Sequence, residues 1–179
     1  MAIERLRALI LAKKDPPTLT HAARTAVAAV VSWFVAHGSG LPEAYWAAIS
    51  TMIVMQSTLG SSLGISAQRF AGTVVGAALG GLLGTYFPGN VLVFGAAVFG
   101  IGAVCAAVRV ERSAYRYAGI TLAIVMLISR PRSPWVIALH RFLEVSIGIV
   151  VGLAISAVWP ERRRHERQQG FISQHSERS

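Results

Sequence analysis

Six apolar segments, separated by short polar breaks, constrain the fold of this chain more than any other feature. They cover about residues 19–37, 43–60, 67–87, 90–108, 114–129 and 135–158. The breaks HGSGLPE, GSSLGIS, FPGN, RVERS and SRPRSP are rich in turn formers or charge. A helix needs about 20 apolar residues to cross a bilayer, and no strand-like alternation persists in any segment. We therefore predict an all-α polytopic membrane protein with six transmembrane helices, of which the second and fifth are short.

Charged residues are scarce and gather mostly between the apolar segments and at the ends. They make up 14% of the chain, where a soluble domain has about a quarter. A net charge of +9 would indicate nucleic-acid binding in a soluble protein. Here the basic residues flank apolar segments, so they are interpreted as topology determinants and contacts with anionic membrane lipid. No nucleic-acid partner is expected, and the single cysteine, Cys105, excludes an intrachain disulfide.

The two ends of the chain differ in composition from the apolar middle. Residues 1–18 mix apolar and basic side chains and finish at Pro16-Pro17, which predicts a cytoplasmic amphipathic helix rather than a cleaved signal peptide. Residues 19–159 form the predicted transmembrane domain. Residues 160–179 form a basic cytoplasmic tail.

The distribution of lysine and arginine predicts the orientation. One set of connections, together with both ends, holds 14 of the 17 basic residues, so both termini are predicted to be cytoplasmic. The opposite side holds only Arg130 and Arg132, within one loop. These two arginines either form an outer basic vestibule that attracts anions or are an exception that a short loop tolerates.

Two stretches that lie 72 residues apart suggest an internal repeat. An arginine precedes two glycines by seven and eleven residues in both QRFAGTVVGAALGG and HRFLEVSIGIVVGLA, where the arginines are Arg69 and Arg141. The preceding segments match as well, with Ile-Val-Met at 53–55 and at 124–126. Because each copy has three helices, the second copy enters the membrane from the opposite side. An inverted repeat of three plus three helices is therefore predicted, as in several transporters. Chance matching of common apolar residues is the alternative.

Glycines recur at every fourth position of the third segment. Gly72, Gly76, Gly80 and Gly84 share one helix face, and Gly148 and Gly152 repeat the pattern in the sixth segment. A face of bare backbone lets a neighbouring helix approach closely, so these six residues are predicted to pack helices together. A backbone-lined conduit is the alternative interpretation.

Arg141 and Glu144 are the ionisable pair most plainly inside an apolar segment. Charge in hydrocarbon costs about 2.5–3.5 kcal/mol per residue, so such groups are usually paired or functional. The spacing allows a local ion pair on one helix face. A sharper hypothesis is that Arg141 attracts an anion while Glu144 or His140 carries a coupling proton. Arg69 opens the third segment, where it either extends to lipid headgroups or faces the same pathway from the opposite side.

Polar and aromatic residues of the second segment are the remaining pathway candidates. Tyr45 and Trp46 lie at its start and are typical of the membrane interface, although they also suit an aromatic substrate. Gln56 lies near its cytoplasmic end and is a candidate polar group of the pathway.

The second and third segments resemble the fusaric acid resistance and aromatic acid exporter group. PEAYWAAISTMIVMQSTLGSS followed by QRFAGTVVGAALGGLLG is similar to its Tyr-Trp start, its Val-Met-Gln ending and its Arg-x-x-Gly-Thr-x-x-Gly opening. The resemblance covers roughly residues 15–160 and includes the closing Trp159-Pro160. Glu144 has no counterpart in these motifs, so its role depends on local physical arguments alone.

The resemblance implies a bacterial inner-membrane transporter that moves organic, chiefly aromatic, anions. The plant aluminium-activated malate channels are distant relatives by this likeness. A single six-helix unit is small for a transport pathway, so a homodimer is expected. Some members of the group act with an adaptor protein. A non-transporting membrane scaffold or assembly subunit, packed through its glycine faces, is the alternative. No phosphate loop, metal-ligand spacing or nucleophile–base set is apparent, so no enzyme activity, cofactor or metal is expected.

Overall fold

The computed structural model describes residues 19–55, 59–108, 112–128 and 131–159. The predicted N-terminal amphipathic helix, the basic tail and Gln56 lie outside the described residues.

Six helices account for almost all of the described chain, which contains no strand. They are α2 (Leu19–Gly38), α3 (Tyr45–Val54), α4 (Leu59–Tyr86), α5 (Val91–Ala107), α6 (Arg112–Leu127) and α7 (Pro134–Val158). The all-α prediction is confirmed, and each predicted apolar segment corresponds to one helix. Local sequence signals explain where several of these helices begin. The Asn90 side chain accepts hydrogen bonds from the backbone N–H groups of Leu92 and Val93, both at 3.1 Å, and so caps α5. Pro134 begins α7 at a position that needs no N–H donor.

Two predicted boundaries were wrong. The predicted break GSSLGIS is helical, because α4 already begins at Leu59. Ser62 and Ser66 are buried there, so tertiary packing outweighs the weak helix propensity of serine and glycine. The second segment is shorter than predicted, because α3 has 10 residues and Met55 adopts an extended backbone. At 1.5 Å per residue, α3 is about 15 Å long, about half of a bilayer core.

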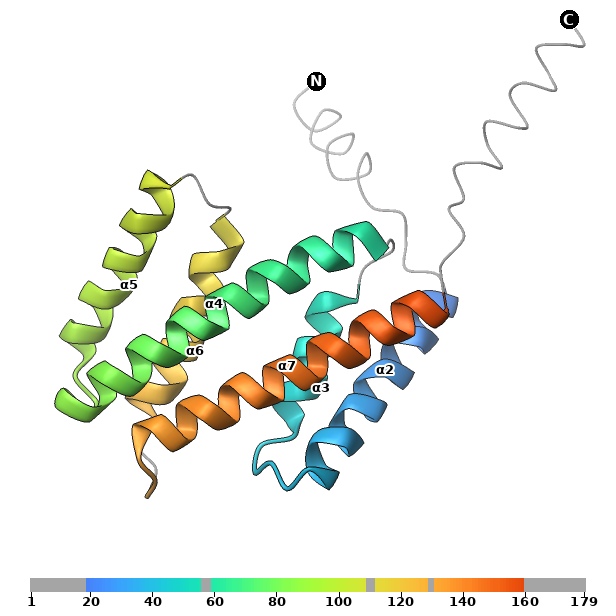
Figure 1. Ribbon diagram of the computed structural model, residues 1–179, viewed down its shortest axis with the longest axis horizontal. Coiled ribbons are helices and arrows are strands. Elements are labelled where there is room, and N and C mark those ends of the chain that lie inside the picture. Colours follow the sequence, from blue (N-terminus) through green and yellow to red (C-terminus); the bar gives the residue numbers. More distant parts are fainter. Residues whose placement is uncertain (1–18, 56–58, 109–111, 129–130, 160–179) are drawn as a thin grey trace, which may run out of the picture.

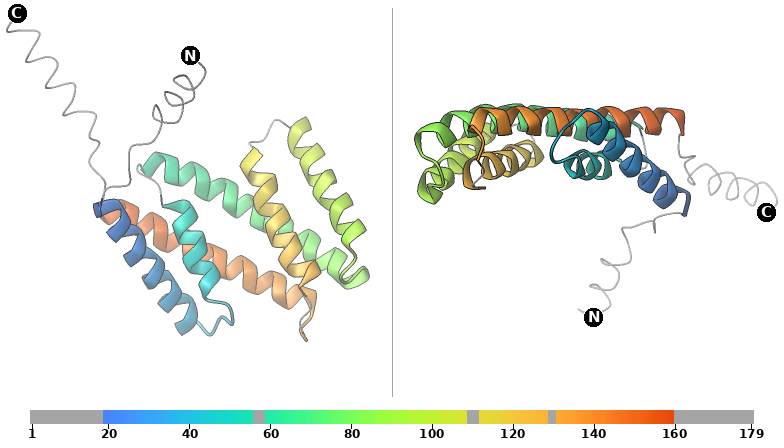
Figure 2. Two further views of the ribbon diagram at one scale, coloured as in Figure 1. Left: turned by 180° about the vertical axis from the view of Figure 1, so that it is seen from behind. Right: turned by 90° about the horizontal axis from the view of Figure 1, so that it is seen from below.

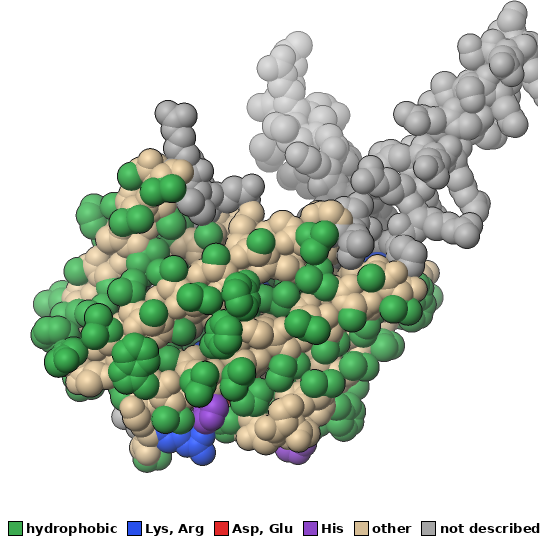
Figure 3. Space-filling view, in the orientation of Figure 1, with side chains coloured by type: hydrophobic (Ala, Val, Ile, Leu, Met, Phe, Trp, Pro, Cys, Tyr) green, Lys and Arg blue, Asp and Glu red, His purple; other side chains and the backbone are tan. Residues whose placement is uncertain are grey.

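Two helices, α2 and α7, are each long and apolar enough to cross a membrane by themselves. The apolar helices α3, α5 and α6 are shorter, and α4 is 28 residues long but rich in glycine. Large apolar side chains such as Phe70, Leu143 and Val150 are exposed on α4 and α7. Figure 3 shows hydrophobic side chains spread across this face of the molecule, with a basic patch at its lower edge.

The helices form two layers (Figure 2). The long helices α4 and α7 lie in one layer, and α2, α3, α5 and α6 lie in the other, where α5 packs mainly on α6. Within this arrangement α4 packs mainly on α6 and on α7, and α7 packs on α3 as well as α4. Successive helices run back and forth between the same two ends (Figure 1). The order of packing therefore brings helices from one half of the chain against helices from the other half.

Both ends of the layered unit are tied by hydrogen bonds. At one end, Arg24 Nη1 of α2 donates to the backbone oxygen of Trp159, after α7, at 2.9 Å. At the other end, the N–H of Gly89, which has a φ of +69°, donates to the backbone oxygen of Met126 at 3.1 Å. The start of α2 therefore lies beside the end of α7. The turn between α4 and α5 is fixed to the end of α6.

Candidate functional site

A buried arginine on α7 organises the candidate site. The Arg141 side chain is 2% exposed and forms ion pairs with two carboxylates. Glu144 lies one turn further along α7, with its Oε2 atom 3.3 Å from Arg141 Nη1. Glu43 reaches Arg141 Nη2 from the loop that precedes α3. The predicted local pair of Arg141 and Glu144 therefore exists, and a third charged residue joins it.

Glu43 receives hydrogen bonds from the two aromatic residues that follow it. The Tyr45 hydroxyl donates to Glu43 Oε2 at 3.0 Å, and Trp46 Nε1 donates to the same oxygen at 3.1 Å. The backbone N–H of Glu43 donates to Glu144 Oε1 at 3.1 Å. We refer to these five residues, Glu43, Tyr45, Trp46, Arg141 and Glu144, as the Arg141 centre. Its donors and acceptors come from α7, from the start of α3 and from the loop before α3.

The guanidinium group of Arg141 also stacks on an aromatic ring. Its carbon atom lies 4.4 Å from the centroid of the Trp46 ring, within the range of a cation–π contact. The aromatic face and two carboxylates replace the water that a buried guanidinium loses. This environment explains how a cation is held at a position with 2% exposure.

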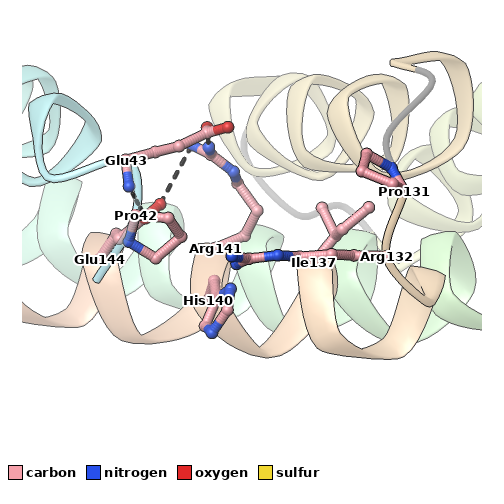
Figure 4. A pocket seen from close by; sticks show the side chains of 8 residues that line it. All are labelled: Pro42, Glu43, Pro131, Arg132, Ile137, His140, Arg141 and Glu144. Carbon is pink, nitrogen blue, oxygen red and sulfur yellow. Dashed lines mark hydrogen bonds and ion pairs between the residues drawn. The ribbon is translucent and has the colours of Figure 1, made fainter. Parts of the chain in front are cut away.

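One cavity opens beside the Arg141 centre, and a second, larger cavity adjoins the first. The smaller, of about 120 Å³, is lined by Glu43, Arg141, Glu144 and His140, and by Arg132 at its rim (Figure 4). The larger, of about 500 Å³, is lined mostly by apolar groups. Arg132 and Ile137 line both cavities, so the two adjoin. Figure 4 shows the side chains of His140 and Arg141 leaving α7 in different directions.

Arg69 is buried in the same way but without a carboxylate. Its side chain is 4% exposed, on the third turn of α4, so the interpretation that it extends to lipid headgroups was wrong. Arg69 Nη2 donates to Ser50 Oγ at 3.0 Å, and the guanidinium carbon lies 5.1 Å from the centroid of the Tyr117 ring. Among the described residues no carboxylate pairs with Arg69, and its Nε atom has no hydrogen-bond partner.

The two arginines flank the place where α4 and α7 meet. The next residues along the chain, Phe70 and Phe142, have ring centroids 5.4 Å apart. Residues related by 71 or 72 positions then make reciprocal contacts. Arg141 stacks on Trp46, whereas Arg69 stacks on Tyr117, which lies 71 residues after Trp46. Each arginine therefore reaches across to the half of the chain to which it does not belong.

The glycines of α4 and α7 follow the same reciprocal pattern. Gly76 faces the backbone of Ala118, and Gly148 faces the backbone of Ala47, which lies 71 positions before Ala118. Gly80 faces Val125, where an added Cβ would lie 2.8 Å from the valine Cβ, and Gly152 faces Val54. Gly72 faces Ala114 and Gly84 faces Pro134. All six glycines predicted to pack helices therefore lie against a neighbouring segment of this chain.

Sequence reasoning identified most members of the site and missed one. The structure brings together Tyr45, Trp46, His140, Arg141 and Glu144, and it places Arg69 at a second position. Glu43 was missed, although it is the acidic residue that directly precedes the Ala-Tyr-Trp motif. Its signal was proximity to that motif, whereas its partner on α7 lies about 100 residues away. No group of three metal-ligating side chains occurs in the described part of the chain.

A family model, described as fusaric acid resistance protein-like, matches residues 27–155. The chain belongs to this family. The match includes both arginine positions and all six packing glycines, as well as Glu43. Family membership and the exposed apolar faces of α4 and α7 together indicate a membrane location.

The chain is 28% identical over 174 residues to an uncharacterized transporter of Gluconobacter oxydans (strain 621H). The alignment covers 88% of this chain and 24% of that protein, so the chain spans about a quarter of its relative's length. No solved structure matches the chain.

Proposed function

We propose that this chain is a membrane transporter domain that moves organic anions, aromatic carboxylates in particular, across the bacterial inner membrane. The observation that carries the proposal is the Arg141 centre. A buried guanidinium group, a phenol O–H and an indole N–H converge on one carboxylate oxygen, and charge-assisted donors of this kind bind carboxylates strongly. The family, and a relative that is described as an uncharacterized transporter, support the membrane-transporter part of this proposal.

The adjoining cavities favour an aromatic anion over a small inorganic one. An organic acid has a charged end and an apolar body. The small cavity presents Arg141 to the charged end, and the apolar cavity of about 500 Å³ has the size of a small-molecule site. Arg132, which is exposed at the rim of both cavities, suits the first encounter with an anion.

The proposed topology has six crossings, with both termini in the cytoplasm. The juxtaposition of the start of α2 with the end of α7 supports an even number of crossings. The reciprocal contacts of Arg69 and Arg141 support two inverted repeats of three helices. Transporters built in this way bind substrate at the interface between repeats, and both arginines flank such an interface. Arg69 is then the second anion-binding position along the pathway.

Glu144 is the proposed carrier of a coupling proton, with His140 as the second candidate. Glu144 is fully buried and contacts the arginine that would bind the anion. A carboxylate that is buried beside the anion-binding arginine is placed to exchange a proton as the anion binds and leaves. Anion and proton would then move together.

Two copies of the chain are expected to form the complete pathway, surrounded by lipid, and an adaptor protein remains a further expectation. The glycine faces are less suited to the alternative function as a scaffold. Gly76 and Gly148, for example, pack against α6 and α3 of the same chain, so these faces are not free to bind another subunit.

Flux measurements test the proposal. The purified 179-residue chain is reconstituted into liposomes, and uptake of radiolabelled benzoate is compared with that of empty liposomes. We expect benzoate uptake that falls at least about tenfold in Arg141→Gln, since the anion loses its charged partner. Uptake equal to that of empty liposomes across a panel of aromatic and aliphatic carboxylates would contradict transport by this chain.

A further inference from the structure

We propose that the carboxylate of Glu43 is a built-in competitor for the transported anion. It occupies the carboxylate site of the Arg141 centre and has to leave before an organic acid binds. This inference rests on the proposed function, since it concerns the same site. It assigns a role to Glu43, which is not among the site residues predicted from the sequence.

The contacts of Glu43 are those that a free carboxylate would make. Its Oε2 atom pairs with Arg141 and accepts hydrogen bonds from Tyr45 at 3.0 Å and from Trp46 at 3.1 Å. Each donor belongs to a side chain held by a helix, either α7 or the start of α3. Any monocarboxylate that enters the small cavity would find the same three donors. Glu43 therefore marks the position of the substrate carboxylate.

Glu43 is also the member of the ion-paired cluster best placed to move. Its side chain is 16% exposed, against 2% for Arg141 and none for Glu144. It lies in the loop between α2 and α3 and lines the small cavity. Its backbone N–H is held separately by Glu144 Oε1 at 3.1 Å. The side chain can consequently rotate out of the site while the loop stays in place, with Arg132 at the rim as an alternative partner.

Charge balance favours exchange over simple addition. With Glu43 in place, Arg141 already faces two carboxylates. A third carboxylate would add negative charge to a buried site, at a large electrostatic cost. A monocarboxylate that replaces Glu43 leaves the charge of the cluster unchanged. Exchange therefore avoids the cost that addition would incur.

The second arginine provides an internal comparison. The residue that lies 71 positions after Glu43 is Ala114, and the residue that lies 72 positions before Glu144 is Gly72. Arg69 therefore has neither equivalent carboxylate, and no other pairs with it among the described residues. Only one of the two arginine positions carries its own competitor.

Benzoate binding to the purified chain in detergent, measured by calorimetry, tests the inference. A competitor reduces the apparent affinity in proportion to the fraction of time for which the site is open. Glu43→Gln should therefore bind benzoate at least about tenfold more tightly than the wild type. Glu43→Ala, as a second variant, should also bind more tightly. The double variant Glu43→Gln/Arg141→Gln should lose this gain in affinity. Uncharged benzamide should bind Glu43→Gln no more tightly than it binds the wild type. Thermal unfolding of each variant verifies that it is folded.

The outcomes separate this inference from the proposed function. Tighter benzoate binding by Glu43→Gln without flux in liposomes would support the competitor and contradict transport. Wild-type flux together with unchanged or weaker binding by folded Glu43→Gln and Glu43→Ala would overturn the competitor and leave transport intact. Absence of benzoate binding to every folded variant would overturn the competitor as well.

Discussion

Arg141 stacks on Trp46, with the guanidinium carbon 4.4 Å from the ring centroid, although the two residues lie 95 positions apart in the sequence. The contact joins α7 to the start of α3 and places an aromatic face, a cation and two carboxylates in one buried cluster. Its counterpart, Arg69 over Tyr117, joins α4 to α6 without any carboxylate. The difference between these two contacts leads to several of the predictions below.

The two arginines should differ in their effect on stability. Arg141→Met removes a cation that pairs with both Glu43 and Glu144, and breaking a buried pair costs about 3–5 kcal/mol. Arg69→Met removes a buried charge that has no carboxylate partner, so the free energy of unfolding should change by less than about 1 kcal/mol or rise. Chemical unfolding of both variants in detergent measures the difference. Equal losses would contradict the assignment of unequal charge environments.

Trp46 contributes through both its ring face and its N–H group. Trp46→Phe keeps an aromatic face for Arg141 but removes the donor to Glu43, which should lower the free energy of unfolding by about 1 kcal/mol. Trp46→Leu should cost about 0.5–2 kcal/mol more, because the cation–π contact is lost as well. Thermal unfolding compares both with Trp33→Phe on α2, which should be nearly neutral. Identical effects of Phe and Leu at position 46 would argue against the stacking contact.

Two glycines of α4 should respond in opposite ways to the same substitution. At Gly76 an added methyl group meets the backbone of Ala118, so Gly76→Ala should destabilise the protein by about 1–3 kcal/mol. At Gly64 nothing lies within 4 Å, so Gly64→Ala should stabilise α4 by up to about 1 kcal/mol through helix propensity. Chemical unfolding of the matched pair tests this prediction. A neutral Gly76→Ala would show that α4 and α6 do not require this close approach.

Glu144 should determine the response of transport to a proton gradient. If it carries the coupling proton, Glu144→Gln abolishes the stimulation of benzoate uptake by an imposed pH gradient, while His140→Asn retains it. The measurement is uptake into proteoliposomes with and without the gradient, at equal amounts of folded protein. A pH dependence of uptake that Glu144→Gln leaves untouched would remove the proton role from this residue. Loss of the response only in His140→Asn would transfer the role to the histidine.

Several features of this protein were readable from local sequence alone. Helical segments follow from runs of apolar residues between turn formers, and the chain places a helix at each predicted run. The pair of Arg141 and Glu144 follows from their spacing, because residues three apart share one helix face. The glycine faces follow from a four-residue interval in the same way. These are short-range relationships, which the geometry of a helix fixes.

Only the tertiary structure decided which helices these faces meet and which charges they share. Nothing local to Glu43 indicates that its carboxylate belongs to Arg141, since the partners come from opposite halves of the chain. The burial of Arg69 was likewise missed, because α4 begins earlier than its serine- and glycine-rich start suggested. Packing between α4 and α6, and between α7 and α3, depends on the joint fit of several helices. A sequence read one segment at a time does not contain that fit, and it is this fit that gives one arginine two carboxylates and the other none.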